Sequence, residues 1–308
     1  PLRVQWFSDG LFVTSVQPGY EDLLGLKVAQ IGDIASEDEL LALLARIVPH
    51  ENAYGLRASS SHYLVRPVIL HALGLTQDLE SGRFVFQDAA ETFTRYLPAM
   101  PVTDTRESWI PALAPSRQPL YLQQPKDVYY WTTYLENSQT LYFQYNVCGE
   151  MKDTPFWEFT RDMFAFMEAH AAQRLVIDLR RNDGGRIESL GPILVNLQQY
   201  PQFSQRGRLF VLIGGRTFSS AVYLASLIQE QTEATFVGEP TAQGPNFYAS
   251  PQRLMLPNSG LEVQYPLVYW QSSEDDAPAI EPDIWVRLSS RDYFAGRDPV
   301  LGRALAVP

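Results

Sequence analysis

The chain has 308 residues, of which 45% are hydrophobic and 19% charged, a composition typical of a globular protein long enough for two domains. The formal net charge is −11 and no run of Lys and Arg is present, which argues against a nucleic-acid partner. No apolar run reaches membrane-spanning length. Cys148 is the only cysteine, which excludes an internal disulfide and a cysteine-based metal site.

The first 75 residues predict a small α+β domain. Residues 11–16 and 27–31 are strand-like runs, and the second run ends at a Gly-Asp turn. Ser36 followed by Glu39 forms a capping box, which predicts a helix that begins there. Two strands and a helix of this size resemble a PDZ-like peptide-binding module, which we place at residues 1–75.

The larger domain is expected to occupy residues 76–308. Its first part, up to residue 125, is rich in proline and predicts irregular or edge-strand structure. Two aromatic, β-branched runs at 129–134 and 140–147 predict a hairpin. Thr154 and Pro155 then predict the N-cap and first position of a helix.

The next part alternates between apolar runs and helical patterns. In chain order we expect a strand at 174–179, a Gly-rich loop at 180–185, a helix at 187–197, a strand at 209–213, a turn and helix at 214–228, and a strand at 234–237. Such alternation predicts a parallel α/β core, whose chemistry lies beyond the carboxyl ends of the strands. The Gly-rich loop and the turn around Ser219 are therefore expected to converge.

Ser219 lies where a buried strand gives way to a helix. A hydroxyl at the first turn of a helix faces unpaired backbone N–H groups and the positive end of the helix dipole, and both would stabilise an oxyanion. This setting suits a serine nucleophile. The same position also suits a serine that only caps the helix, so Ser219 and Ser220 keep both interpretations on position alone.

Four motifs resemble those of the C-terminal processing (tail-specific) serine peptidases, in the same order along roughly residues 128–305. They are Asp-Leu-Arg-Arg-Asn-Asp-Gly-Gly at 178–185, Thr-Phe-Ser-Ser-Ala at 217–221, Gly-Glu-Pro-Thr at 238–241, and the closing Pro-Asp-Ile at 282–284 with Asp-Pro at 298–299. The resemblance implies a ClpP/crotonase-like α/β core, often joined to a PDZ-like module, and serine-type endopeptidase activity.

The resemblance also assigns roles to residues of the candidate site. Ser219 would be the nucleophile, and the backbone N–H groups of Ser220 and of Gly184 or Gly185 would form the oxyanion hole. Tail-specific members carry a lysine base shortly after the Gly-Glu-Pro-Thr segment, but residues 242–247 hold no lysine. The chain therefore resembles the tricorn-like branch, which uses a histidine base.

The histidine base is not evident among the four histidines. His170 ends a predicted helix just before a core strand, so we expect it at the amino edge of the sheet, away from Ser219. His50, His62 and His71 lie in the first domain, where each also suits a surface or packed role. Three acidic residues are candidates to orient a base, with a solvated role as the alternative: Glu239, Asp276 and Glu281.

We expect a serine-type peptidase that acts on peptide or protein substrates by acyl transfer through Ser219, without a metal or cofactor. Its general base is expected upstream of residue 1, because the chain begins at Pro1 without the Asp-x-His-Thr type segment of tricorn-like relatives. The resemblance further implies an exported protein, periplasmic or secreted, whose signal peptide is missing. The alternative is a family member without activity that binds a peptide or an apolar ligand. The sequence leaves the oligomeric state open.

Overall fold

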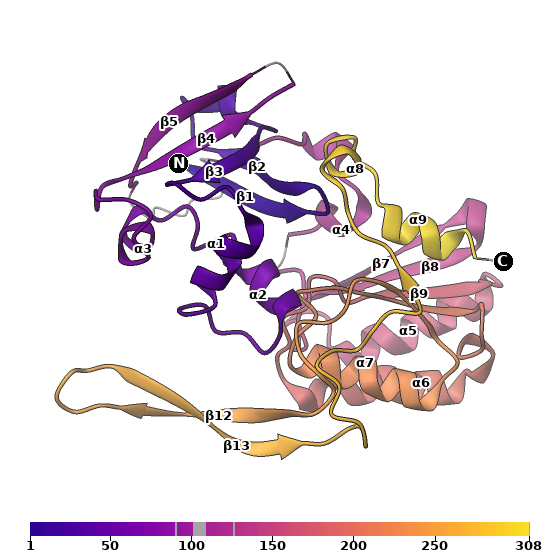
Figure 1. The fold of residues 1–308 in the computed structure, drawn as a ribbon. Helices are drawn as coiled ribbons and strands as arrows, with labels where there is room; N and C mark the ends of the chain where they lie inside the picture. The colour runs from indigo at the N-terminus through magenta and orange to yellow at the C-terminus, as the bar shows by residue number, and fades with distance from the viewer. Residues whose placement is uncertain (90, 101–108, 126, 308) are drawn as a thin grey trace. The chain divides into compact units, whose positions relative to one another are not determined.

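A computed structural model describes residues 1–89, 91–100, 109–125 and 127–307. The chain forms two compact units (Figure 1). The first unit comprises Pro1–Pro125 with Val286–Ala306, and the second comprises Lys126–Trp285 with Val307–Pro308. The domain limit expected at residue 75 falls inside the first unit, before the strand β4 (Ser81–Gln87). Within the described ranges, no helix is both long and apolar enough to cross a membrane.

The first unit is built on an antiparallel sheet. Its strands follow the order β1 (Leu2–Phe7), β2 (Gly10–Val16), β3 (Lys27–Ile31), β4 (Ser81–Gln87) and β5 (Thr92–Pro98), and β6 (Ile110–Pro111) pairs with β2. Its helices are α1 (Glu37–Leu44), α2 (Ala53–Ser60), α3 (Pro67–Ala72), α4 (Leu120–Gln123), α8 (Ser290–Phe294) and α9 (Pro299–Leu305). Ser36 caps α1, as predicted, because its Oγ accepts the N–H of Glu39 at 3.3 Å.

Helix α8 joins the first unit through a contact with the β1–β2 turn. The carboxylate of Asp9 accepts hydrogen bonds from the backbone N–H of Ser290 at 2.9 Å and from its hydroxyl at 2.5 Å. Burial is the largest single effect and raises the pKa of Asp9. The hydrogen bonds from Ser290 and the charge of Lys27 together outweigh it, so the pKa of Asp9 lies below its usual value. Segments at opposite ends of the sequence thereby share one unit.

The second unit is built on a mostly parallel sheet. Its strands follow the order β14 (Ile284–Trp285), β11 (Thr235–Gly238), β10 (Leu209–Ile213), β9 (Arg174–Asp178), β8 (Thr140–Tyr145) and β7 (Tyr130–Leu135). The strands from β14 to β8 pair in parallel, whereas β7 pairs with β8 as an antiparallel edge. The central strands β9 and β10 are buried along almost their whole length, which explains why they appear as continuous apolar runs in the sequence.

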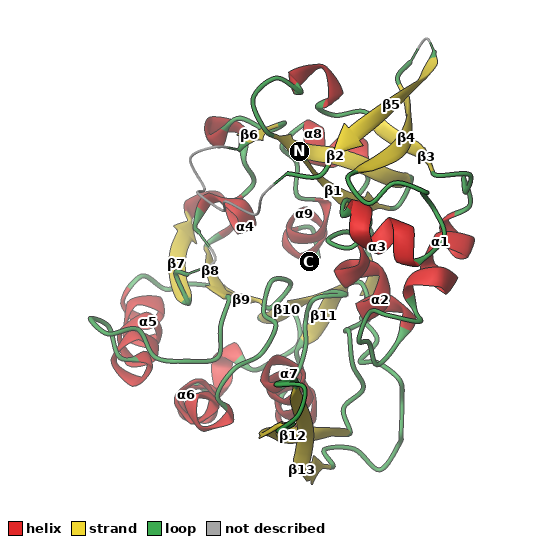
Figure 2. Ribbon diagram, turned by 90° about the vertical axis from the view of Figure 1, so that its left-hand side faces the viewer, coloured by secondary structure: helices red, strands yellow, loops and turns green. Residues whose placement is uncertain are grey.

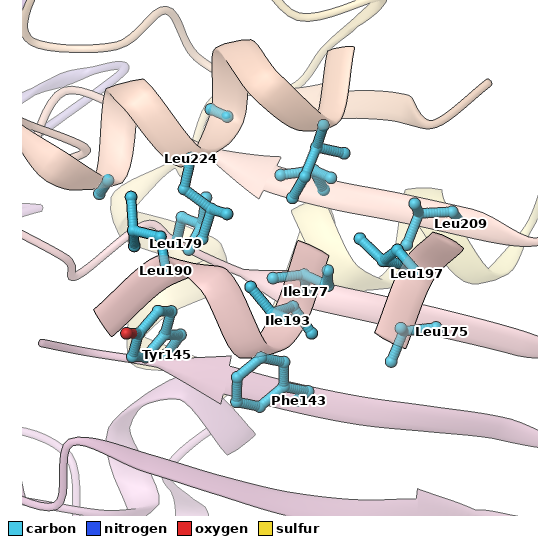
Figure 3. Packing of buried hydrophobic residues seen from close by; sticks show 14 of the residues in the cluster. Phe143, Tyr145, Leu175, Ile177, Leu179, Leu190, Ile193, Leu197, Leu209 and Leu224 are labelled. Carbon is cyan, nitrogen blue, oxygen red and sulfur yellow. The ribbon is translucent and has the colours of Figure 1, made fainter. Parts of the chain in front are cut away.

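Three helices, α5 (Phe156–Ala169), α6 (Gly191–Gln199) and α7 (Ser220–Gln231), lie along the same face of this sheet (Figures 1 and 2). Leu190, Ile193 and Leu197 pack there against Phe143 from β8 and Ile177 from β9 (Figure 3). Thr154 was predicted as the N-cap of α5, but the structure has Pro155 in that place and Glu150 accepts the first helical N–H at 2.7 Å. Short 3₁₀ turns occur at Glu21–Leu23, Pro115–Arg117, Glu136–Ser138, Ile187–Leu190 and Pro201–Phe203.

A long hairpin forms a separate two-stranded sheet in the second unit. Strands β12 (Phe247–Met255) and β13 (Glu262–Trp270) pair with each other, and nearly all their side chains are exposed. At its base, Asn246 Oδ1 accepts the backbone N–H groups of Ser272 and Ser273, each at 3.0 Å. The base of the hairpin is therefore fixed close to the segment that follows β11.

A buried polar network lies at the carboxyl ends of β8 and β9. The side chain of Asp178 is completely buried and accepts the hydroxyl of Tyr142 at 2.7 Å and the guanidinium of Arg180 at 2.6 Å. Its other oxygen accepts the backbone N–H of Arg180 at 3.0 Å. The carboxylate thus ties the end of β9 to the loop that follows.

Replacing Asp178 with Asn should therefore destabilise the fold. The change leaves the largely buried Arg180 guanidinium without its carboxylate, and breaking a buried ion pair costs about 3–5 kcal/mol. Asp162→Asn is the matched control, because Asp162 and Arg161 form an ion pair with both side chains more than half exposed, and such pairs contribute less than about 1 kcal/mol. Urea unfolding of both variants would give the change in the free energy of unfolding for each. An Asp178→Asn variant of wild-type stability would show that the charge is not needed for folding.

Candidate active site

Ser219 lies in a sharp turn between β10 and α7. Its backbone has φ 55° and ψ −126°, in the positive-φ region that residues other than glycine rarely adopt. Such strain costs on the order of 1–3 kcal/mol and clusters at functional sites. The side chain is half-buried, and within the described residues no group forms a hydrogen bond with its Oγ. The turn thus holds the hydroxyl in a strained position without using it as a helix cap.

Buried hydrogen bonds fix this turn from below. The hydroxyl of Thr217 donates to the carbonyl of Leu179 at 3.0 Å and accepts the N–H of Gly214 at 3.1 Å. The backbone N–H of Phe218 donates to the carbonyl of Asn182 at 3.0 Å. These bonds connect the turn after β10 to the loop after β9, as expected for two parallel strands that end at the same edge.

The Gly-rich loop is held mainly by the buried side chain of Asn182. Its Oδ1 accepts the N–H of Gly184 at 2.9 Å, and its Nδ2 donates to the carbonyl of Tyr145 at 2.9 Å. Gly184 has φ 99° and Gly185 has φ 143°, both in the region that favours glycine. The two glycines therefore let the loop turn sharply toward Ser219.

Both glycines also allow close backbone approach. A Cβ at Gly184 would lie 2.6 Å from the Cβ of Ser219, and a Cβ at Gly185 would lie 2.1 Å from the carbonyl oxygen of Cys148. The hydroxyl of Ser220 donates to the carbonyl of Gly185 at 2.8 Å. The structure thus brings Ser219, Ser220, Gly184 and Gly185 together.

The three backbone N–H groups near Ser219 differ in their partners. The N–H of Gly184 is used by Asn182. The N–H groups of Gly185 and Ser220 have no hydrogen-bond partner in the part of the chain that the structure describes, and Ser220 is the first residue of α7. Unpaired N–H groups at a helix N-terminus favour a negative charge.

Gln243 was not identified from the sequence, yet it contacts Ser219 directly. Its side chain is 3% exposed, and its Oε1 accepts the backbone N–H of Ser219 at 2.9 Å. The only sequence signal is its place in the segment 242–247, where tail-specific peptidases have a lysine and this chain has none.

The three predicted acids all follow β11 in the chain. Glu239 follows β11 and its backbone N–H donates to the carbonyl of Ile213 at 3.2 Å. Asp276 and Glu281 are exposed. None of the three forms a hydrogen bond with Ser219, whose backbone N–H is taken by Gln243.

The histidines do not complete the site within the second unit. His170 ends α5 and its Nδ1 lies 2.9 Å from the carbonyl of Phe166, just before β9 begins. It therefore lies at the opposite end of the strands from Ser219, as predicted. His50, His62 and His71 belong to the first unit.

Cys148, the single cysteine of the sequence, lies close to the Gly-rich loop, with its Sγ 3.6 Å from Asn182 Oδ1. Cys148 is 1% exposed, and burial raises the pKa of its thiol to about 12, so it stays protonated near neutral pH and is not a competing nucleophile. Among the described residues, no group of three or more His, Cys, Asp or Glu side chains could hold a metal ion.

Comparisons with known proteins agree with the motifs at 217–221, 238–241 and 282–284, which lie within the matched range. Residues 191–286 match the profile of peptidase family S41. Mature CPAF complexed with lactacystin has a similar structure, with a TM-score of 0.63, 13% identity, and coverage of 99% of this chain and 82% of that chain. A second structure of mature CPAF gives a TM-score of 0.55, 14% identity, and coverage of 99% and 81%. At these identities the likeness shows a shared fold.

A search of curated protein sequences found no match. The family match covers α6, the Ser219 turn, α7 and the strands up to β14. The predicted resemblance to the C-terminal processing serine peptidases is therefore confirmed, since residues 191–286 match peptidase family S41.

Proposed function

We propose that the chain is a serine-type endopeptidase that cleaves peptide bonds through Ser219. The observation that carries this proposal is the Ser219 hydroxyl itself, which is unpaired in the described structure and lies on a strained turn at the N-terminus of α7. The match to family S41 supports a peptidase that acts on peptide or protein substrates.

The oxyanion hole is assigned to the backbone N–H groups of Ser220 and Gly185. Both lack partners within the described residues, whereas the N–H of Gly184 already bonds to Asn182. Gly184 would then serve the site by its close packing against Ser219. Donors that are already oriented toward a developing negative charge stabilise the transition state of acyl transfer.

The reaction would follow the usual course for a serine nucleophile. Ser219 Oγ attacks the scissile carbonyl carbon while its proton passes to a general base, and the carbonyl oxygen becomes the oxyanion. The tetrahedral intermediate collapses, the protonated amine leaves, and an acyl-enzyme remains. Water, activated by the same base, then releases the acid and restores the hydroxyl.

We place the general base outside the second unit. His170 lies at the wrong end of the strands, and residues 242–247 hold no lysine. The resemblance to the tricorn-like branch favours a histidine from a segment that precedes residue 1. The same resemblance supports a crotonase-like core and a PDZ-like module at residues 1–75. Glu239, Asp276 and Glu281 stay as candidates to orient that histidine.

A second candidate function is a protein without activity that binds a peptide or an apolar ligand. The observation that favours it is the Ser219 hydroxyl, which contacts no base in the described ranges. Under this alternative, Ser219→Ala would leave ligand binding unchanged.

Ser219→Ala should abolish peptide turnover and labelling by a fluorophosphonate probe, with no change in thermal unfolding. Ser220→Ala should retain labelling and turnover at a reduced rate, because it keeps the backbone N–H but loses the hydrogen bond to Gly185. Mass spectrometry of the labelled peptide identifies the modified serine. The assignment is wrong if Ser220→Ala is inactive while Ser219→Ala is active.

The 308-residue chain should hydrolyse peptides about 10²–10⁴-fold more slowly than a longer native chain that supplies the histidine, since general-base assistance has this magnitude. Initial rates of both chains on one fluorogenic peptide provide the test. Equal rates would exclude an upstream base. His62→Ala, followed by His50→Ala and His71→Ala, would then identify a base in the first unit.

Gly185→Ala should both destabilise the protein and reduce turnover. The new methyl group overlaps the carbonyl of Cys148, and alanine at φ 143° adds backbone strain of about 1–3 kcal/mol. Gly191→Ala is the control, because a Cβ there meets no atom within 4 Å. Melting curves and turnover would be measured for both. Wild-type values for Gly185→Ala would contradict the loop geometry.

A further inference from the structure

The carboxamide of Gln243 has one satisfied end and one unsatisfied end. Its Oε1 accepts the N–H of Ser219 at 2.9 Å. Its Nε2 has no hydrogen-bond partner among the described residues, and it is not one of the fully buried polar atoms that lack a partner, so it keeps some accessible surface although the residue is only 3% exposed. An accessible amide donor without a partner in the protein is free to bond to an acceptor from outside the chain, either water or the carbonyl oxygen of a bound peptide.

The orientation of this carboxamide follows from the bond that it makes. The backbone N–H of Ser219 can only donate, so the atom that faces it must be the oxygen of Gln243, and the NH₂ group is the other end of the same planar amide. The NH₂ donor of Gln243 therefore belongs to the same amide group that contacts the backbone of Ser219.

The chain around Gln243 holds the carboxamide in place. Thr241 Oγ1 donates to the carbonyl of Gln243 at 2.7 Å and accepts the N–H of Ile280 at 2.9 Å. The N–H of Ala242 donates to the carbonyl of Thr217 at 3.0 Å, within the Ser219 turn. On the other side, a Cβ at Gly244 would lie 2.2 Å from the carbonyl oxygen of Ala277. The segment cannot shift away from the turn without losing these contacts.

We propose that Gln243 has two roles in the reaction at Ser219, and this proposal rests on the function proposed above. Its Oε1 positions the nucleophile by holding the strained backbone of Ser219. Its Nε2 donates a hydrogen bond to the carbonyl oxygen of the bound peptide, and this bond strengthens as that oxygen becomes the oxyanion. Gln243 thereby adds a side-chain donor to the backbone N–H groups of Gly185 and Ser220.

Several backbone N–H groups near the Ser219 hydroxyl are already hydrogen-bonded, which explains why a side-chain donor is useful here. Because Gln243 occupies the Ser219 N–H and Asn182 occupies the Gly184 N–H, only two nearby backbone donors stay unpaired in the described structure. Losing one oriented donor of an oxyanion hole lowers kcat by about 10²–10³-fold.

The test compares Gln243→Met with Gln243→Glu. Methionine is similar in size but neither accepts nor donates, so kcat should fall about 10²–10³-fold or more. Glutamate keeps an oxygen for the Ser219 N–H but, when ionised, lacks the donor and repels the oxyanion. Its kcat should fall at least as far, with a smaller change in KM. Gln198→Met and Gln198→Glu, on the exposed surface of α6, are matched controls that should leave turnover unchanged.

The pH dependence separates donation from positioning. When the introduced carboxyl of Gln243→Glu is protonated, its O–H can replace the lost N–H donor. Its kcat relative to wild type should therefore rise as the pH falls, whereas that of Gln243→Met should not. Wild-type kcat for Gln243→Glu at every pH would overturn the donor role, and wild-type kcat for Gln243→Met would overturn both roles.

Failure of the proposed function would be recognised separately. If the wild-type chain, supplied with its base, neither turns over peptide nor reacts with the fluorophosphonate at Ser219, then the peptidase proposal and the donor role of Gln243 are both wrong. Hydrogen exchange of the Ser219 amide still tests positioning. Faster exchange in Gln243→Met than in Gln243→Glu supports the contact, and equal exchange overturns it.

Discussion

The site depends first on one buried amide side chain, that of Asn182. Its Nδ2 bonds to the carbonyl of Tyr145 at the end of β8, its Oδ1 holds the N–H of Gly184, and its own carbonyl accepts the N–H of Phe218. Three segments of the sequence are thus joined by one fully buried residue. Buried amide groups rarely lack hydrogen-bond partners. Keeping all three of these bonds therefore restricts the conformation of the loop beside Ser219.

The strained backbone of Ser219 is maintained by contacts from several elements. Positive φ at a residue with a Cβ is unfavourable, and the surrounding bonds must hold it there. The parallel strands set the spacing of the two loops, Thr217 anchors the turn to the end of β9, and Gln243 takes the Ser219 N–H. Backbone strain that is maintained by several surrounding contacts is typical of functional sites.

Much of this arrangement could be predicted because it depends on local patterns. The apolar runs at 174–179 and 209–213 indicated buried parallel strands, and such strands end at a common edge, which placed the Gly-rich loop beside Ser219. Gln243 could not be predicted, because its role comes from a contact with a residue 24 positions away in the sequence. The proposed choice of Gly185 over Gly184 likewise depends on which N–H Asn182 takes, and the spacing of residues in the sequence carries no such information.

The N-terminus of α5 is a second case in which a contact made by the fold could not be predicted from the local sequence. Thr154 and Pro155 have the residue types of a helix start, but the N–H of Phe156 is satisfied by the side chain of Glu150, which lies six residues earlier.

At Ser219 a residue type that commonly caps helices does not act as a cap. A serine at a helix N-terminus usually caps it, yet here the hydroxyl makes no cap bond and Ser220 bonds to the Gly-rich loop instead. A serine that does not cap its helix and lies beside two N–H groups unpaired in the described structure has the oxyanion-stabilising surroundings of the proposed nucleophile, although its general base has still to be supplied. A residue kept only for helix stability would gain nothing from the strain.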